Sequence, residues 1–391
     1  MMPAVKAILE LRDRLIATQS PLASEQVGLE LASGRFLSRP VTALVAAPPF
    51  TCSAMDGFAV RSAEVTGPVE LPYHQVIYAG APAGPLQPGQ VARIFTGASL
   101  PAGADAVVRE ESVELAGARV RFRVRARPGE NVRPAGEDVA AGEEALPAGM
   151  RLGPRQLALL SAVGVDVVTV TRRPRVAVIS TGDEIAGGRT PDSNGLAVSA
   201  LCRAVGAEVE RLVVPDRLDE VTEALGAAVA RCDAVLTIGG VSIGERDLVP
   251  VALRALSAEL LIHGVPMKPG KPFLFASLGG RPLIGLPGSP SACLVAFEVF
   301  ARPALLKLAG AAAPFRRVLR LRLDEPASGK PGRARLLWAR LTPRGTVAPV
   351  GRDAAQLRGP ALADALLLID AGEGELAAGA EVTAWLLDDA G

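Results

Sequence analysis

The sequence Val176-Ala-Val-Ile-Ser-Thr-Gly-Asp-Glu184 opens the stretch that decides the fold. Two later apolar runs, Ala234-Val-Leu-Thr-Ile-Gly-Gly240 and Pro282-Leu-Ile-Gly-Leu-Pro-Gly288, also end in glycine. Each run is short and rich in β-branched residues or leucine, which is typical of a strand buried on both faces. Helical patterns lie between the runs, at about 197–205 and 218–230. This alternation predicts a parallel sheet built from βαβ units.

Chemically active residues follow the ends of these predicted strands. In open parallel sheets, ligands bind in the crevice beyond the carboxyl ends of the strands. The Asp183-Glu184 pair suits a hard cation or acid/base chemistry there, although Asp183 is also suited to cap a helix. The Gly239-Gly240 pair lets backbone N–H groups approach a phosphate, and Asp247 follows that loop. We therefore expect the three glycine-bearing turns to line one pocket.

Two further segments predict an oxyanion site. Lys268-Pro-Gly-Lys271 holds two cations around a rigid turn, which suits an oxyanion, although lysines on a surface turn are common. Leu286-Pro-Gly-Ser-Pro290 precedes a helix predicted at Leu294–Leu308. Ser289 is a good N-cap, and the free N–H groups of a helix start favour an anion. A well-capped structural helix explains the same residues nearly as well.

The composition is ordinary for a globular protein, with 49% of the 391 residues hydrophobic and 21% charged. A formal net charge of +1 gives no global attraction for nucleic acid or an anionic membrane. The four cysteines form no CxxC pair, which fits a reducing compartment and argues against structural zinc. No apolar run reaches the ~18 residues of a membrane helix. These features predict a cytoplasmic protein with no nucleic-acid or membrane partner.

The flanking segments predict a division into domains. Apolar positions between Val5 and Ile16 follow a helical period, and Ser24 and Gly34 are placed to begin and end a second helix. Short apolar runs separated by Gly- and Pro-rich turns follow, and they return after Pro314, which indicates all-β structure. The predicted domains are a discontinuous helical and linking domain (1–45 and 142–172), a β module (46–141), an α/β domain (173–310) and a separate C-terminal β domain (314–391).

Five arginines alternate with apolar residues from Arg119 to Arg127. A period of two would place all five on one face of a strand. A nucleic-acid groove is one interpretation of that face. We favour a half-buried strand with a solvated outer face, whose arginines pair with Glu110, Glu111 and Glu114.

Eight groups of residues, in order along the chain, make this sequence resemble the molybdopterin molybdenumtransferase family, which includes the C-terminal domain of gephyrin. The resemblance runs from about residue 21 to residue 391. Its carriers are Pro48-Pro-Phe50 with Ser53-Ala-Met-Asp-Gly-Phe-Ala59, Arg93-Ile-Phe-Thr-Gly97, Asn131-Val-Arg-Pro-Ala-Gly-Glu-Asp138, Ser180-Thr-Gly-Asp-Glu184, Asp192-Ser-Asn194, Gly239-Gly-Val-Ser242 with Asp247, Met267-Lys-Pro-Gly-Lys-Pro272 and Leu286-Pro-Gly288.

The resemblance implies an elongated subunit of the α/β class. It would have a central parallel-sheet domain of the molybdopterin-binding type, an inserted all-β module, a helical N-terminal part and a small C-terminal β domain. It also implies a homodimer, with each active site between the central domain of one subunit and the β module of the other. The family reaction inserts molybdenum from molybdate into adenylylated molybdopterin and releases AMP, with Mg²⁺ present. A molybdopterin adenylyltransferase would be the upstream partner.

The resemblance also implies roles for individual residues. Glu184 and Asp247 are the expected metal ligands, and Lys268 and Lys271 match family residues associated with molybdate. The catalytic set implied by the family is Asp56, Thr96, Asp138, Glu184, Asp216 and Asp247. The substrate-binding set expected around it is Thr181, Gly182, Asp183, Ser193, Asn194, Gly239, Gly240, Ser242, Lys268, Lys271, Pro287, Gly288 and Ser289.

The sequence departs from the family pattern at the start of the closing helix. The family usually reads Leu-Pro-Gly-Asn-Pro-Val-Ser, whereas here Ser289 replaces Asn and Ser291-Ala292 replaces Val-Ser. Ser289 keeps the capacity to cap the helix. The serine lost at Ala292 weakens an oxyanion contact, unless the adjacent Ser291 supplies it.

The resemblance leads to a hypothesis for the chemistry. Sulfur displaces the oxo groups of molybdate as water, so protons must be supplied. Asp56 or Asp216 would donate them if burial raises the carboxyl pKa. Two alternatives to this reaction stay open. One is ATP-dependent adenylylation of molybdopterin, because the central domain alone resembles the enzymes that do this. The other is a non-catalytic scaffold of the gephyrin type.

Overall fold

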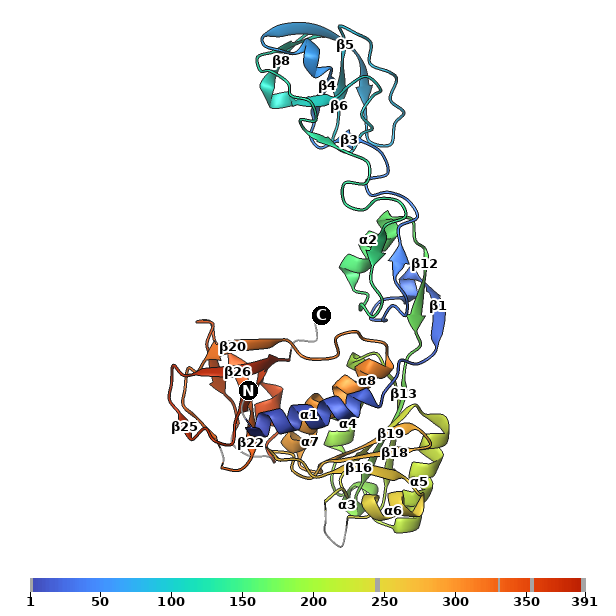
Figure 1. Ribbon diagram of the computed structural model, residues 1–391, viewed down its shortest axis with the longest axis vertical. Coiled ribbons are helices and arrows are strands. Elements are labelled where there is room, and N and C mark those ends of the chain that lie inside the picture. Colours follow the sequence, from blue (N-terminus) through green and yellow to red (C-terminus); the bar gives the residue numbers. More distant parts are fainter. Residues whose placement is uncertain (1–2, 243–246, 330, 352–354, 388–391) are drawn as a thin grey trace.

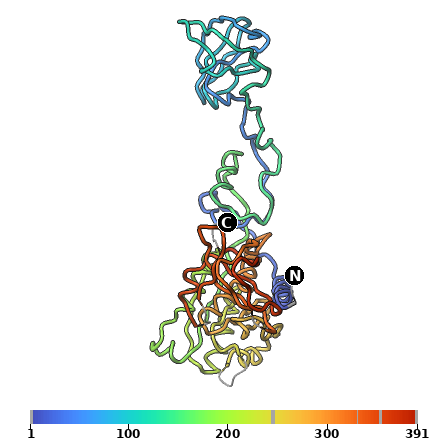
Figure 2. The backbone as a smooth tube through the Cα atoms, turned by 90° about the vertical axis from the view of Figure 1, so that its left-hand side faces the viewer, coloured from blue at the N-terminus to red at the C-terminus, as the bar shows by residue number. Residues whose placement is uncertain are grey.

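The chain folds into an elongated molecule, described by the computed structural model at residues 3–242, 247–329, 331–351 and 355–387. The α/β domain and the C-terminal β domain form a broad base, a linking domain follows, and the β module stands at the far end (Figures 1 and 2). Within the described ranges, no helix has the length and apolar character needed to span a membrane.

The central domain is a six-stranded mixed sheet with the order β14-β13-β15-β19-β18-β16. Four neighbouring strands are parallel, as the sequence predicts, and the two pairings at one edge, β19 with β18 and β18 with β16, are antiparallel. The antiparallel edge arises because the chain returns directly from β18 to β19 through a Gly279-Gly280 turn. The bounds are β13 Arg175–Thr181, β14 Glu208–Val214, β15 Ala234–Ile238, β16 Glu259–His263, β18 Leu274–Leu278 and β19 Arg281–Leu286.

Helices cover both faces of this sheet. One face buries Ala177, Ile179 and Val235 against α5 (Leu218–Arg231) and α6 (Val249–Ala255). The other face packs on the remaining helices, which are α4 (Ser193–Ala204), α7 (Pro290–Ala296), a π-helical turn (Phe297–Ala301) and α8 (Arg302–Leu308). A short helix, α3 (Asp183–Ala186), follows β13 directly. Helix α4 begins earlier than predicted because the Asp192 carboxylate caps it, accepting from Gly195 N at 2.9 Å.

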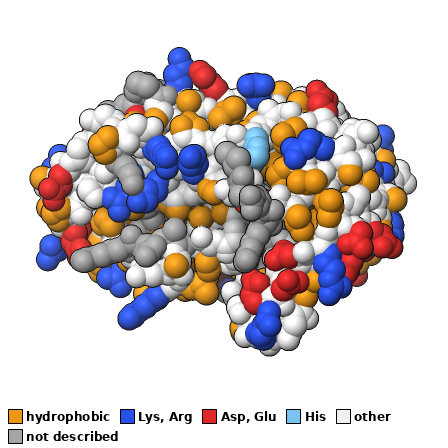
Figure 3. Space-filling view, turned by 90° about the horizontal axis from the view of Figure 1, so that it is seen from below, with side chains coloured by type: hydrophobic (Ala, Val, Ile, Leu, Met, Phe, Trp, Pro, Cys, Tyr) orange, Lys and Arg blue, Asp and Glu red, His pale blue; other side chains and the backbone are white. Residues whose placement is uncertain are grey.

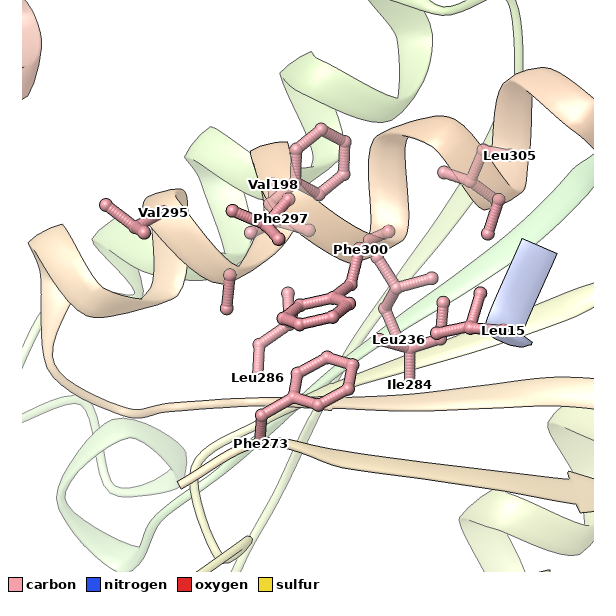
Figure 4. Packing of buried hydrophobic residues seen from close by; sticks show 14 of the residues in the cluster. Leu15, Val198, Leu236, Phe273, Ile284, Leu286, Val295, Phe297, Phe300 and Leu305 are labelled. Atoms are coloured by element: carbon pink, nitrogen blue, oxygen red, sulfur yellow. The ribbon is translucent and has the colours of Figure 1, made fainter. Parts of the chain in front are cut away.

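Helix α1 (Pro3–Ala17) has the predicted helical period, but its placement differs from the expected linking domain. Ile8 and Leu15 are buried in the core of the α/β domain, among Leu236, Ile284 and Phe300 (Figure 4). The buried Asp370 of the C-terminal domain accepts hydrogen bonds from the first backbone N–H groups of this helix. The apolar side of α1 therefore packs against the base of the molecule, not against the linking domain.

The linking domain corrects a second expectation. The segment from Ser24 is β1 (Ser24–Gly28), not a helix, and it pairs antiparallel with β12 (Val167–Thr171). The cross-strand pairing outweighs the local capping pattern, because β12 supplies a buried partner strand that a helix would lose. The other elements are the 3₁₀ turn Leu29–Leu31, β2 (Val41–Thr42), β11 (Glu144–Leu146) and α2 (Pro154–Ala162).

The β module has its own six-stranded sheet, in the order β7-β4-β6-β5-β9-β8, and its own buried core. Its strands are β3 (Cys52–Ser53), β4 (Gly57–Val60), β5 (Val69–Ile77), β6 (Val91–Ile94), β7 (Ala106–Arg109), β8 (Val113–Ala116), β9 (Arg119–Phe122) and β10 (Val132–Arg133). Two 3₁₀ turns, Ser62–Glu64 and Glu110–Ser112, complete it.

The arginine run of this module is only partly a strand. Strand β9 ends at Phe122, so only Arg119 and Arg121 of the five share its exposed face. Glu70 pairs with both, at 2.9 and 3.2 Å. Glu114 pairs with Arg121 and Arg123, as predicted, but Glu110 pairs with Arg93 instead, at 2.6 Å.

The C-terminal β domain is not separate from the base. Its sheet has the order β17-β22-β24-β26-β20, and β17 (Met267–Lys268) belongs to the segment before β18 of the α/β domain. Leu336, Trp338 and Trp385 lie in the same buried core as α1 and α8. The remaining bounds are β20 (Val318–Arg322), β21 (Ala327–Ser328), β22 (Ala334–Leu341), β23 (Val347–Pro349), α9 (Arg358–Ala361), β24 (Ala365–Ile369), β25 (Glu375–Leu376) and β26 (Glu381–Leu386).

Candidate functional site

A cavity of about 640 Å³ lies where the ends of β15 and β19 meet the turn after β17. Nine of the residues proposed from the sequence line it, and seven others complete its wall. The nine are Gly239, Gly240, Ser242, Asp247, Lys268, Lys271, Pro287, Gly288 and Ser289. The seven are Val241, Met267, Pro269, Gly270, Pro272, Ala292 and Arg333. Three of the predicted motifs, far apart in sequence, therefore converge on one cavity.

The glycine pair after β15 shapes one wall. Gly239 and Gly240 both have positive φ angles, +85° and +62°, which side chains rarely adopt. A Cβ atom at either position would lie 3.2 Å from Thr181 Oγ1. Thr181 is 8% exposed and lies behind this loop instead of lining the cavity. Glycine is needed here for both backbone conformation and space.

The cavity is cationic on one side. Lys268 and Lys271 both line it, and their side chains are exposed to solvent. Arg333 adds a third cation from the segment that enters β22, and Asp247 is the acidic residue among the described lining. Figure 3 shows Lys and Arg side chains gathered beside a hollow on the lower face of the molecule. Such a surface attracts and holds an oxyanion.

Sequence reasoning missed Arg333. It stands in the basic turn Pro331-Gly-Arg-Ala-Arg335, which the pattern alone would assign to a solvated strand end. The parallel pairing of β22 with β17 brings that turn to the cavity. The only local signal was an arginine in a Gly- and Pro-containing turn of the predicted C-terminal β domain, which many surface turns share.

The start of helix α7 corrects two expectations. Ser289 occupies the N-cap position and lines the cavity, but its hydroxyl makes no capping hydrogen bond. Ser291 is 3% exposed, and its Oγ accepts a hydrogen bond from Trp338 Nε1 at 2.8 Å. Ser291 therefore faces away from the cavity and does not replace the serine missing at Ala292. The cavity wall at Ala292 lacks that hydroxyl.

Several predicted residues lie near the cavity but outside its lining. Asn194, at the start of α4, donates from Nδ2 to the carbonyl of Gly288 at 2.7 Å, and Ser193 precedes it. Asp183 Oδ1 accepts from the backbone N–H of Asp216 at 3.1 Å, which joins the ends of β13 and β14. Gly182 and Glu184 also lie outside the lining. The Glu184 carboxylate folds back towards Gly182. The expectation that Glu184 lines one pocket with Asp247 and Lys271 is not met.

The predicted catalytic residues of the β module form a separate group. Asp56 accepts hydrogen bonds from Thr96 Oγ1 at 2.7 Å and Thr96 N at 2.8 Å. These bonds, with Arg93 nearby, lower the pKa of the exposed Asp56 carboxyl below its ordinary value. Asp56 is exposed within one chain, so the burial that would make it a proton donor is not met there. Asp138 pairs with Arg133 at 3.1 Å.

This group lies far from the cavity within one chain. The β module and the base occupy opposite ends of the molecule (Figure 1). The fold of one chain thus brings Asp56 and Thr96 together, and separately brings Asp247 to the lysines. It does not bring the two groups to each other.

The carboxylate at the cavity fits one mode of Mg²⁺ binding. Among the described residues, no three His, Cys, Asp or Glu side chains cluster closely enough to hold a metal ion by themselves. Mg²⁺ is usually held by one or two carboxylates together with substrate phosphates and water, not by an all-protein cage. Asp247 beside the glycine loop fits that mode, in which the ion arrives with a phosphate.

The arrangement defines a class of protein, and comparisons with known sequences support it. Three family profiles match in order along the chain. They are the MoeA N-terminal region (domain I and II) at residues 4–164, a probable molybdopterin binding domain at 177–307, and the MoeA C-terminal region (domain IV) at 320–387. The fold and the cavity are thus those of a multidomain α/β protein with a molybdopterin-binding type of central domain.

Individual relatives narrow the class. A molybdopterin molybdenumtransferase of Nostoc sp. is 39% identical over 329 residues, covering 80% of this chain and 76% of the relative. Molybdopterin molybdenumtransferase 2 of Mycobacterium tuberculosis is 37% identical over 386 residues, covering 92% and 94%. The crystal structure of a molybdopterin biosynthesis MoeA protein from Pyrococcus horikoshii OT3 superposes with a TM-score of 0.84 at 27% identity, covering 99% and 100%. The chain belongs to the molybdopterin molybdenumtransferase family.

Proposed function

We propose that this protein transfers molybdenum from molybdate to adenylylated molybdopterin and releases AMP. The observation that carries the proposal is the single cavity that joins Lys268, Lys271 and Arg333 to a glycine loop and Asp247. Cations suit a tetrahedral oxyanion, and the backbone of a glycine loop suits a phosphate. The cationic wall of the cavity thus matches molybdate, and the glycine-loop wall matches the phosphate of adenylylated molybdopterin.

Each wall has a distinct part in this proposal. Lys268, Lys271 and Arg333 hold molybdate by charge and hydrogen bonds beside the pterin sulfurs. The backbone N–H of Gly240 faces the adenylate phosphate in this proposal, with Asp247 close by, whereas the Gly239 N–H donates to the Leu286 carbonyl at 3.1 Å and fixes the loop. When bound there with Asp247 as a ligand, Mg²⁺ would polarise that phosphate and stabilise the leaving AMP. The assignment of Glu184 as a second ligand would require it to turn from Gly182 towards the cavity.

Protons are needed because oxo groups leave molybdate as water. Asp56 is unsuited to donate them within one chain, because its exposed carboxylate accepts two hydrogen bonds from Thr96, which favour the ionised form. We propose instead that the Asp56 carboxylate, held by Thr96, orients the substrate. Asp216, at the end of β14, is also exposed within one chain, so it would serve as the donor only where bound substrate or a partner subunit covers it.

We further propose that the protein works in the cytoplasm as a homodimer in which the β module of one subunit reaches the cavity of the other. The Asp56–Thr96 pair supports this arrangement, because it is a built polar group in a module with no large cavity near it among those described. A molybdopterin adenylyltransferase would supply the substrate.

The test is to mix the purified full chain with adenylylated molybdopterin, molybdate and Mg²⁺, and to measure AMP. Molybdate-dependent AMP release with molybdenum bound to the pterin is the expected result. A parallel reaction with ATP and plain molybdopterin separates the adenylylation alternative, because that activity would give adenylylated product. Binding of adenylylated molybdopterin without turnover in either reaction would overturn the proposal and favour a scaffold.

A further inference from the structure

One strand of the C-terminal domain, β22, contacts both walls of the cavity. At its beginning, β22 pairs in parallel with β17, so that Ala334 lies beside Met267 and Arg335 beside Lys268. Ala334 N also donates to the carbonyl of Pro266 at 3.0 Å. The backbone that carries Lys268 is thereby fixed to the C-terminal domain, with Arg333 immediately before the strand.

The same strand reaches the opposite wall through Trp338. Its Nε1–H donates to Ser291 Oγ in the first turn of α7 at 2.8 Å. Both side chains are buried, at 8% and 3% exposure. The neighbours of Ser291 on this turn, Ser289 and Ala292, line the cavity. The hydrogen bond therefore connects β22 to the turn that forms the cavity wall.

The side chains that make these contacts lie on one face of β22. Ala334, Leu336 and Trp338 alternate along the strand and are all buried in the core shared with α7 and α8. A side chain on this face cannot move without disturbing that core, because buried interiors are close-packed. The separation of Lys268 from the first turn of α7 is thus set by one rigid strand.

We propose that Trp338 is a positioning residue that holds the first turn of α7 in register with Lys268 and Arg333, and so sets the affinity for the oxyanion. The inference rests on the proposed function, because the oxyanion is taken to be molybdate. It also explains the departure at Ser291, where the family pattern has valine. Valine would leave the buried indole N–H without a partner, and the hydroxyl satisfies it.

The test uses Trp338→Phe and Ser291→Ala in the full chain. Each is expected to raise the KM for molybdate in AMP release by about threefold to tenfold, the equivalent of one buried hydrogen bond. The kcat should stay within about twofold, because neither residue touches the reacting atoms. The double variant should shift KM no further than the larger single variant, since both changes remove the same bond.

Trp385→Phe is the matched control. Trp385 is the other tryptophan of the chain, is equally buried in the C-terminal domain, and does not line the cavity. Its variant should keep the wild-type KM for molybdate even if its melting temperature falls. With Trp385 replaced, Trp338 is the sole indole, and molybdate binding should change its fluorescence.

Equilibrium dialysis of molybdate against the same proteins keeps the test independent of turnover. If the wild type binds molybdate but releases no AMP, the proposed function fails, and the affinities still decide the role of Trp338. An unchanged molybdate affinity in Trp338→Phe would overturn the inference. Additive effects of the two single variants, or an equal loss in Trp385→Phe, would also overturn it.

Discussion

The β module and the C-terminal β domain have similar sequence patterns but differ in how they meet the α/β domain. The C-terminal domain shares a sheet with β17, a core with α1 and α8, and a cavity wall through Arg333. The β module keeps a core of its own and stands at the far end of the molecule. Short strands and Gly-Pro turns predict a β fold in both cases. They do not predict which of the two becomes part of the base.

The difference separates two kinds of functional residue. Arg333 reaches the cavity because strand pairing brings it there within one chain. Asp56 and Thr96 are joined to each other at 2.7 Å but not to the cavity of the same chain. Arg333 should therefore act in the cavity of its own chain, whereas Asp56 and Thr96 should act only in the cavity of a second subunit.

The largest expected effect concerns the cores. Leu15→Ala should lower the free energy of unfolding of the base by about 2–5 kcal/mol, because Leu15 is 1% exposed among tightly packed side chains. The unfolding of the β module should be unchanged, since its core is separate. Calorimetry of the full chain measures both transitions. Leu115→Ala, at a side chain 50% exposed on β8, is the control. One common transition that shifts as a whole would contradict the separation.

The second effect concerns the cavity. Asp247→Asn should reduce kcat/KM for AMP release by about tenfold to a hundredfold, the loss typical of residues around a metal site. Steady-state kinetics at saturating Mg²⁺ measures it. Glu223→Gln, an exposed carboxylate change on α5, should have no effect. Turnover of Asp247→Asn at the wild-type rate would contradict the assignment of Asp247 to the metal and phosphate site.

The third prediction tests whether the two regions meet across subunits. Asp56→Asn and Asp247→Asn chains, each strongly impaired alone, should recover about half of wild-type activity in mixed dimers isolated after co-expression with different tags. Each mixed dimer would have one intact site. Mixed dimers purified by both tags provide the measurement. If they stay as impaired as the parents, the β module does not act in the partner's cavity.

The smallest effect is a pKa. Thr96→Val should raise the pKa of Asp56 towards its ordinary value of 3.8, because the hydroxyl hydrogen bond is the largest cause of its lowering. The ionised carboxylate stabilises the folded chain above the ordinary pKa, and this contribution is lost as the pH falls through the lowered value. Carbon-13 NMR of the Asp56 carboxyl gives the titration. Thr342→Val, in the C-terminal domain, should leave it unchanged, and an unshifted midpoint in Thr96→Val would assign the lowering to the Thr96 backbone N–H and Arg93.

The sequence by itself determined three parallel strands of the central domain, the helices that follow them and the residues at the strand ends. Periodicity and glycine placement report local backbone conformation, and parallel strands bring their carboxyl ends to one edge, so the convergence of Gly239 and Gly288 was predictable. The capping pattern at Ser24 predicted a helix wrongly, because the partner strand β12, which makes this segment a strand, lies far along the chain.

Tertiary structure alone decided which distant segments share a wall. Arg333, the burial of Ser291 under Trp338 and the docking of α1 all depend on contacts between residues far apart in sequence. Such contacts follow from the packing of whole domains, and no local pattern encodes them. The sequence motifs therefore predicted part of the cavity lining, but the distance between its walls was set by β22, the strand that joins two domains.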